Sequence, residues 1–116
     1  MFDLARSGGT DELTSYLDRG APVNLSNEKG DTLLLLAAYH GNPGTVAALL
    51  ARGADHARVN DNGQTALAAA VFKQSAEAVE HLLAAGADPD HGAQSARATA
   101  QFFGLDAMTE VLDRPR

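Results

Sequence analysis

The sequence LLARGAD at residues 49–55 returns as LLAAGAD at residues 82–88, 33 positions later. A second pair of segments keeps the same separation, GDTLLLLA at residues 30–37 and GQTALAAA at residues 63–70. Laying residues 27–59 over 60–92 gives 12 identities in 33 positions, where average composition predicts about three. A fixed internal period of this length predicts a repeat architecture, in which similar units stack on one another.

The same period extends beyond these two units in both directions. Backward, Leu4 and Gly8 fall on the positions of Ala37 and Gly41. Forward, a deletion of three residues aligns Ala100 with Ala37. Each unit leaves an apolar face that a neighbour or a cap must cover. We therefore expect one domain over residues 1–116, divided into an N-terminal capping repeat (1–26), two full repeats (27–59 and 60–92) and a C-terminal capping repeat (93–116).

Each full unit reads as a turn followed by two helices. In the first unit, Gly30 provides the positive φ of a tight turn, and Thr32 is the expected N-cap of a short helix over residues 33–39. Asn42 is the expected N-cap of a second helix, which begins with proline and ends at Gly53. The second unit repeats these signals with Gly63, Thr65, a first helix over residues 66–72, Ser75 and Gly86. The leucines at helical spacing, above all Leu49 and Leu82, are expected in the core.

These strings resemble the ankyrin repeat, which has the same 33-residue period. The matching motifs are Gly-x-Thr-x-Leu-x-x-Ala at residues 30–37 and 63–70 and Leu-Leu-Ala-x-Gly-Ala-Asp at residues 49–55 and 82–88. The resemblance covers essentially the whole chain. It implies an all-α solenoid with no regular sheet beyond short contacts at the turns. The alanine-rich, aromatic-poor style is similar to that of the small stand-alone ankyrin proteins of bacteria.

The chain departs from the family pattern in one motif. The family's Thr-Pro-Leu-His is replaced by Thr-Leu-Leu-Leu at residues 32–35 and by Thr-Ala-Leu-Ala at residues 65–68. The hydrogen bonds that this histidine usually makes between repeats are therefore expected to be absent. We expect this change to affect stability and not the fold.

Composition and charge exclude several classes of function. Hydrophobic residues make up 45% of the chain, which is enough to build a packed core. The net charge of −6 disfavours binding to nucleic acid or to anionic membranes, both of which are usually contacted by clustered Lys and Arg. No apolar stretch is long enough to span a membrane or to serve as a secretory signal. The chain contains no cysteine, which fits the reducing environment of the cytoplasm. We therefore expect a cytoplasmic protein. We also expect it to be a monomer in isolation.

No set of residues points to catalysis. The chain lacks the Gly-x-x-x-x-Gly-Lys-Ser/Thr phosphate loop and the Gly-x-Ser-x-Gly nucleophile elbow. Neighbouring carboxylates such as Asp11 and Glu12 fall at predicted helix starts, where they complement the helix dipole. The histidines fall at different phases of the repeat, so they are not expected to converge on a metal; they are His40, His56, His81 and His91. We predict no cofactor, no metal site and no enzyme activity.

The family resemblance implies a concave binding groove, formed by the turn tips and by the two residues that end each first helix. Carried over onto this sequence, the helix-end pairs are Arg6 and Ser7, Tyr39 and His40, Phe72 and Lys73, and Phe102 and Phe103. The corresponding turn tips are Glu28, Lys29, Asp31, Asp61, Asn62 and Gln64. These residues form the predicted site for a protein partner.

Aromatic residues occupy one equivalent position in three successive units, as Tyr39, Phe72 and Phe102. Aromatic side chains are enriched at binding hot spots, so a row of rings across the groove favours partner binding. Packing of each ring against the next repeat is the alternative explanation, and the sequence does not decide between them. We expect an adaptor or regulator that binds a protein. An accessory role, in which the chain stabilises an enzyme encoded beside it, is the other hypothesis.

Overall fold

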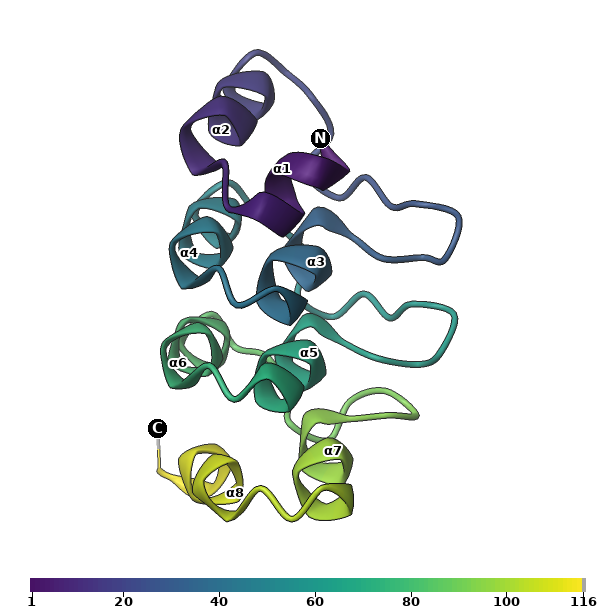
Figure 1. The fold of residues 1–116 in the computed structure, drawn as a ribbon, viewed down its shortest axis with the longest axis vertical. Coiled ribbons are helices and arrows are strands. Elements are labelled where there is room, and N and C mark those ends of the chain that lie inside the picture. The colour runs from purple at the N-terminus through teal and green to yellow at the C-terminus, as the bar shows by residue number, and fades with distance from the viewer. Residues whose placement is uncertain (116) are drawn as a thin grey trace.

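The computed structural model describes residues 1–115, and over these residues the chain forms four helix pairs stacked along its longest axis (Figure 1). The helices are α1 (Phe2–Ser7), α2 (Thr10–Asp18), α3 (Leu33–Tyr39), α4 (Pro43–Ala51), α5 (Ala66–Lys73), α6 (Ala76–Ala84), α7 (Ala96–Phe102) and α8 (Asp106–Asp113). The described part of the molecule measures 40 × 26 × 21 Å, which is the elongated shape expected of a stack of repeats.

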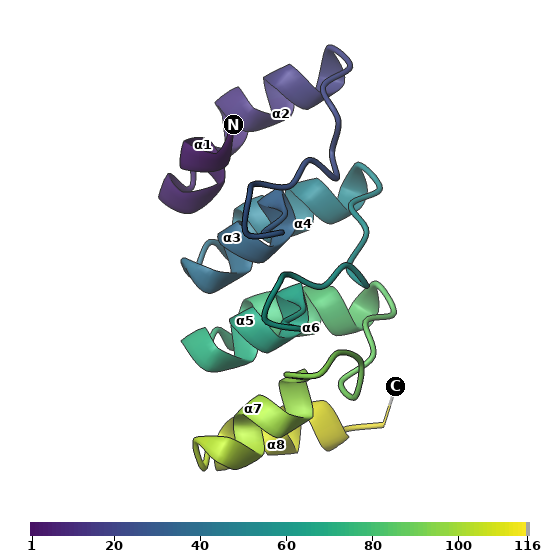
Figure 2. The same ribbon diagram turned by 90° about the vertical axis from the view of Figure 1, so that its right-hand side faces the viewer.

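The helices form two layers. The first helices of the pairs, α1, α3, α5 and α7, pack on one another, and the second helices, α2, α4, α6 and α8, form a parallel row behind them (Figures 1 and 2). Loops between the pairs project from the stack on the side of the first helices. Within residues 1–115, β-structure is limited to two isolated bridges, Ser26–Thr32 and Gln64–Gln94. The predicted all-helical solenoid is confirmed.

Polar residues cap the helices largely as the sequence predicts. The hydroxyl oxygens of Thr32 and Thr65 each accept the backbone N–H three residues later at 3.1 Å. Ser75 does the same for α6 at 3.3 Å. Asn42 is the N-cap residue of α4, as predicted, but its side chain makes no capping hydrogen bond. Its amide group instead reaches back across the repeat boundary to the last turn of α1.

The core lies between the two layers and between successive pairs. Leu49 and Leu82 have no exposed surface, as predicted. Small side chains line the contacts between first helices, where Ala37 and Ala70 are fully buried. Because alanine projects little from the helix, these short helices can approach closely and share one continuous apolar core.

Backbone hydrogen bonds join successive loops. The N–H of Asp61 donates to the carbonyl of Lys29, and the N–H of Gln94 donates to the carbonyl of Gly63, both at 3.0 Å. Gly63 adopts a φ of 75°, and a Cβ at this position would lie 2.8 Å from the Cβ of Ala93. Glycine is therefore required twice at this turn, by its backbone conformation and by the close approach of the next loop.

Candidate protein-binding groove

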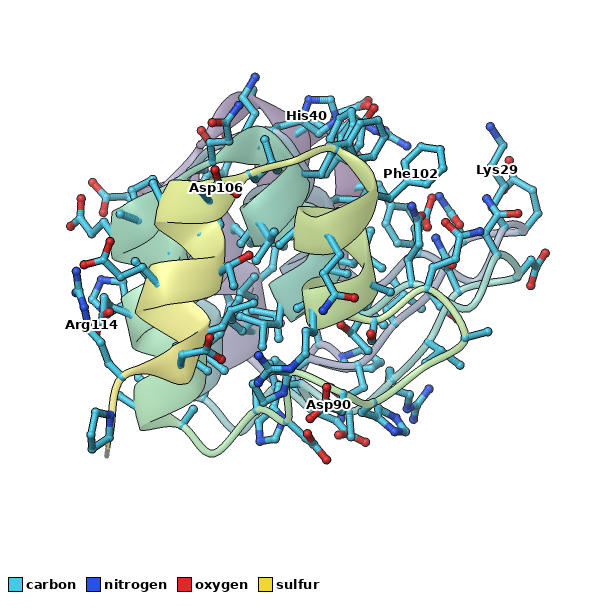
Figure 3. The ribbon with its side chains drawn as sticks, turned by 90° about the horizontal axis from the view of Figure 1, so that it is seen from below. Lys29, His40, Asp90, Phe102, Asp106 and Arg114 are labelled. Atoms are coloured by element: carbon cyan, nitrogen blue, oxygen red, sulfur yellow. The ribbon has the colours of Figure 1, made fainter. Side chains whose placement is uncertain are left out.

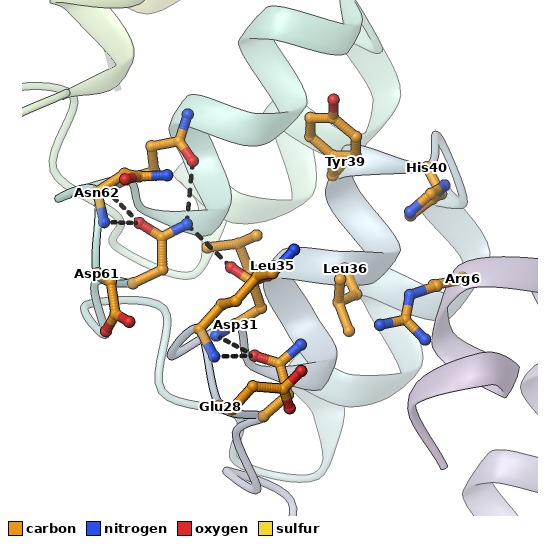
Figure 4. A pocket seen from close by; sticks show the side chains of 13 residues that line it. Arg6, Glu28, Asp31, Leu35, Leu36, Tyr39, His40, Asp61 and Asn62 are labelled. Atoms are coloured by element: carbon orange, nitrogen blue, oxygen red, sulfur yellow. Dashed lines mark hydrogen bonds between the residues drawn. The ribbon is translucent and has the colours of Figure 1, made fainter.

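The projecting loops and the first helices enclose a groove on one side of the stack. Its larger hollow has a volume of about 690 Å³. Leu35 and Leu36 of α3 form its floor, and both are at most 5% exposed. The remaining lining residues are Arg6, Asn27, Glu28, Lys29, Asp31, Tyr39, His40, Asn60, Asp61, Asn62 and Gln64. Figure 4 shows Tyr39 and His40 at the helix end, with Asp31 and Asp61 on the loops.

Two asparagines hold the loop wall of this hollow in place. The Oδ1 atom of Asn27 accepts the backbone N–H groups of Lys29 and Asp31, both at 3.0 Å. Asn60 plays the same role one repeat later, where its Oδ1 accepts the N–H groups of Asn62 and Gln64. These bonds fix each loop locally, so the charged tips project from a rigid base.

Four aromatic rings form a continuous ridge along the helix-end side of the groove. Tyr39 and Phe72 stack with their planes 5° apart and their ring centroids separated by 5.7 Å. Phe72 meets Phe103 edge to face at 5.3 Å, and Phe103 meets Phe102 at 4.9 Å. We call Tyr39, Phe72, Phe103 and Phe102 the aromatic ridge. Edge-to-face and offset arrangements of this kind are the favourable geometries for ring pairs.

The ridge is exposed to solvent in spite of these contacts. Tyr39 and Phe72 are each 43% exposed, Phe103 is 52% exposed and Phe102 is 83% exposed. The expected row of three equivalent rings is therefore joined through a fourth, because Phe72 contacts Phe103. The rings pack on one another across repeats, as the packing explanation expects, and each still presents a large apolar surface. Partner binding at this row stays a prediction.

Nine of the fourteen predicted groove residues line the larger hollow, and Ser7 ends α1 beside it without lining it. Phe102 and Phe103 line a second hollow of about 390 Å³, together with Ala93, Gln94, Ala98 and Thr99. Phe72 lies between the two hollows, in contact with Tyr39 of one and Phe103 of the other. The Lys73 side chain lies against the backbone at Gly41. Figure 3 shows Phe102 on the same side of the molecule as Lys29, with Arg114 on the opposite side.

Sequence reasoning missed the floor and the base of the groove. Leu35 and Leu36 belong to the run of four leucines after Thr32, a run that by itself predicts only an apolar helix. Asn27 and Asn60 are the identical first residues of the two full repeats, but this identity alone does not indicate that they hold the loops. The signal that could have found them is an asparagine two residues before an exposed turn position, which favours a side-chain turn.

The charges in the groove are distributed unevenly. The guanidinium of Arg6 is held by Asp3 at 2.9 Å. Asp31 accepts a hydrogen bond from Asn60 at 2.9 Å. Glu28 and Asp61 form no ion pair with any other residue in 1–115. Carboxylates therefore dominate the loop wall of the larger hollow, while the lining of the smaller one carries no formal charge.

The histidines do not assemble into a site. His56 and His91 lie near one another around a small hollow of about 260 Å³, where a ring nitrogen of His91 is 2.8 Å from the carbonyl of Ala57. His40 lies in the groove and His81 lies on α6. Across residues 1–115, no three His, Asp or Glu side chains are arranged to hold a metal ion. No helix in this part of the chain is long and apolar enough to cross a membrane.

The stacked helix pairs, the bonded loops and the groove define a helical repeat protein with a groove along one side. A family model described as ankyrin repeats (3 copies) matches residues 1–93, and the chain belongs to the ankyrin repeat family. An ankyrin repeat protein of Pseudomonas aeruginosa is 54% identical over 46 residues, which cover 40% of this chain and 27% of that relative. Ankyrin repeats generally mediate contacts between proteins, and the resemblance predicted from the motifs is confirmed.

Proposed function

We propose that this chain is an adaptor or regulator that binds one protein partner in its concave groove. The observation that carries the proposal is the aromatic ridge, which stays exposed in a molecule whose large aliphatic side chains are mostly buried. Rigid rings provide a large contact area and lose little conformational entropy on binding. Exposed rings that run continuously along a groove are therefore suited to anchor a partner.

The groove is also well ordered before a partner arrives. Its floor is buried core, its loops are fixed by asparagine side chains, and successive loops are joined by backbone hydrogen bonds. A preorganised surface avoids the cost of ordering loops and side chains on association. We expect binding without a large change in the shape of this chain.

Binding accounts for these residues better than catalysis does. The groove offers surface, anchors and charge, but no nucleophile paired with a base and no arrangement for a metal among residues 1–115. We place this binding in the cytoplasm, since a chain without cysteine is suited to a reducing compartment.

Affinity capture from a native lysate tests the proposal. The tagged wild type is compared with a variant that carries Tyr39→Ala, Phe72→Ala and Phe103→Ala, after circular dichroism has shown that both are folded. Tyr16→Ala is the matched control, because this ring is 41% exposed but lies on α2, away from the groove. A protein retained by wild type and control but lost by the triple variant is the expected result.

The same experiment separates the other hypotheses. If the captured protein is an enzyme whose half-life depends on this chain, the accessory role replaces the adaptor role. Equal capture by the triple variant would remove the groove from the binding site. Turnover of a substrate that survives the triple substitution would favour catalysis instead.

A further inference from the structure

The two hollows of the groove differ in chemistry. The larger one has Glu28, Asp31 and Asp61 along its loop wall and the ring of Tyr39 opposite. Its basic side chains are Lys29 at the loop tip and Arg6, whose charge is already balanced by Asp3. With Asp3 included, four carboxylates face two basic groups at this end of the groove.

The smaller hollow is uncharged and largely apolar. Phe102 and Phe103 form one side, and the methyl groups of Ala93 and Ala98 lie nearby. Gln94 and Thr99 are its polar members. Its volume of about 390 Å³ is within the range of about 300 to 1,000 Å³ typical of ligand sites. An apolar side chain entering it would contact two exposed rings.

Phe72 sets the distance between the two ends. Tyr39 lies 5.7 Å from it on one side, and Phe103 lies 5.3 Å from it on the other. An extended peptide advances about 3.3 Å per residue. About three to four residues of such a segment would therefore pass from the ring of Phe103 to the ring of Tyr39.

From these features we infer that the partner presents an extended segment, with an apolar side chain in the smaller hollow and a Lys or Arg about four residues away in the larger one. This inference rests on the proposed function and adds the chemistry of the partner. The basic group meets the carboxylates of Glu28 and Asp61, and its aliphatic stem lies along Tyr39, where a cation also gains from the ring face. The net charge of −6 attracts such a segment from solution.

Selection from a library of random linear peptides displayed on phage tests this inference directly, since it needs no known partner. The immobilised wild type is expected to enrich peptides with one large apolar residue and one Lys or Arg at the stated spacing. An enriched peptide, synthesised with a fluorescent label, then serves as the probe for affinity measurements on variants whose fold has been checked by circular dichroism.

Two double variants test the two ends of the groove separately, and a third double variant is the control for charge. Glu28→Gln with Asp61→Asn is expected to weaken the probe roughly 3- to 30-fold and to reduce the salt dependence of binding. Glu12→Gln with Glu110→Gln removes the same charge from exposed positions on α2 and α8 and should change affinity by less than about twofold. Phe102→Ala with Phe103→Ala should weaken the probe by roughly 30-fold or more.

Several results would overturn the inference. One is a library that yields no enriched peptide, or only acidic or wholly apolar peptides. Another is an equal loss of affinity for the probe in the two double variants that remove charge. A concentration-dependent dimer that the Phe102 and Phe103 substitutions abolish would show that a second copy of the chain fills the groove. The peptide-selection and charge-substitution outcomes leave the proposed function intact, because that function is tested separately by capture of a protein from lysate with the wild type and the triple variant.

Discussion

Asn60 donates a hydrogen bond from Nδ2 to Oδ1 of Asp31 at 2.9 Å, across 29 residues of sequence. The same amide group donates to Oε1 of Gln64 at 3.0 Å, while its oxygen accepts two backbone N–H groups. Asn60 is only 9% exposed. This chain lacks the histidine with which the family usually bonds successive repeats, and Asn60 provides a side-chain bond between loops.

Asn60→Ala is expected to lower the free energy of unfolding by about 1 to 3 kcal/mol, because it leaves two backbone N–H groups and a carboxylate oxygen without their partner. Chemical denaturation measures the effect. Asn62→Ala is the control, since Asn62 lies exposed at the tip of the same loop. Equal midpoints for the two variants would show that the network contributes nothing to stability.

Leu49→Ala and Leu82→Ala should each lower the free energy of unfolding by roughly 2 to 5 kcal/mol. Both leucines are fully buried between helix layers, so truncation removes transfer free energy and leaves a cavity. A shift in denaturation midpoint no larger than that of Glu110→Ala, an exposed position on α8, would contradict this account of the core.

Much of the fold could be predicted from the sequence because its signals are local or periodic. The 33-residue identity predicted stacked helix pairs, and Thr32 and Thr65 marked helix starts within one residue of those observed. The rings at the helix ends occupy equivalent positions in the 33-residue repeat, and this alone predicted that they lie on one side of the molecule. Each of these features depends on backbone geometry within one unit, which a repeated pattern specifies directly.

Contacts between units were harder to predict. Asn42 has the sequence of an N-cap, yet its Nδ2 donates to the carbonyls of Ala5 and Arg6 at 3.0 and 2.9 Å. Alignment likewise predicted a row through Phe102, but the ring of Phe103 is the one that meets Phe72. Both outcomes depend on the offset and rotation between successive pairs, which no single unit encodes.

The hydroxyl groups of Thr10 and Thr45 form another contact between repeats, with their oxygens 2.6 Å apart. Thr45 is 2% exposed. Thr45→Val keeps the shape but leaves the Thr10 hydroxyl with only the longer bond to the carbonyl of Gly8 at 3.3 Å, so a loss of about 1 kcal/mol in unfolding free energy is expected. The double variant Thr10→Val, Thr45→Val should lose less than the sum of the single variants. Strict additivity in a double-mutant cycle would show that the two hydroxyls are not coupled.

Stability should depend on pH through Asp18 and Arg52. The hydrogen bond from the Arg52 guanidinium lowers the pKa of the exposed Asp18 carboxyl below its ordinary value, and a smaller loss of hydration opposes the shift. The charged carboxylate is therefore favoured by folding, and its contribution is present at neutral pH and lost as pH falls below about 4. Asp18→Asn should be slightly less stable than wild type at pH 7, with the difference vanishing in acid and shrinking in high salt. A stability difference that stays constant from pH 7 into acid would contradict this account.

The final prediction compares Phe72 with Leu82. Phe72 contacts Tyr39 and Phe103 but remains 43% exposed, whereas Leu82 has no exposed surface. If the ridge binds the partner, Phe72→Ala should change the denaturation midpoint much less than Leu82→Ala while weakening the partner's affinity by roughly 2 kcal/mol or more, the range of hot-spot residues. If the ridge serves mainly to hold the repeats together, this order reverses. Stability and affinity must be measured on the same preparations, because loss of folded protein would imitate loss of binding. A stable Phe72→Ala protein that binds at full strength would move the search for the interface to the second helices, α2, α4, α6 and α8.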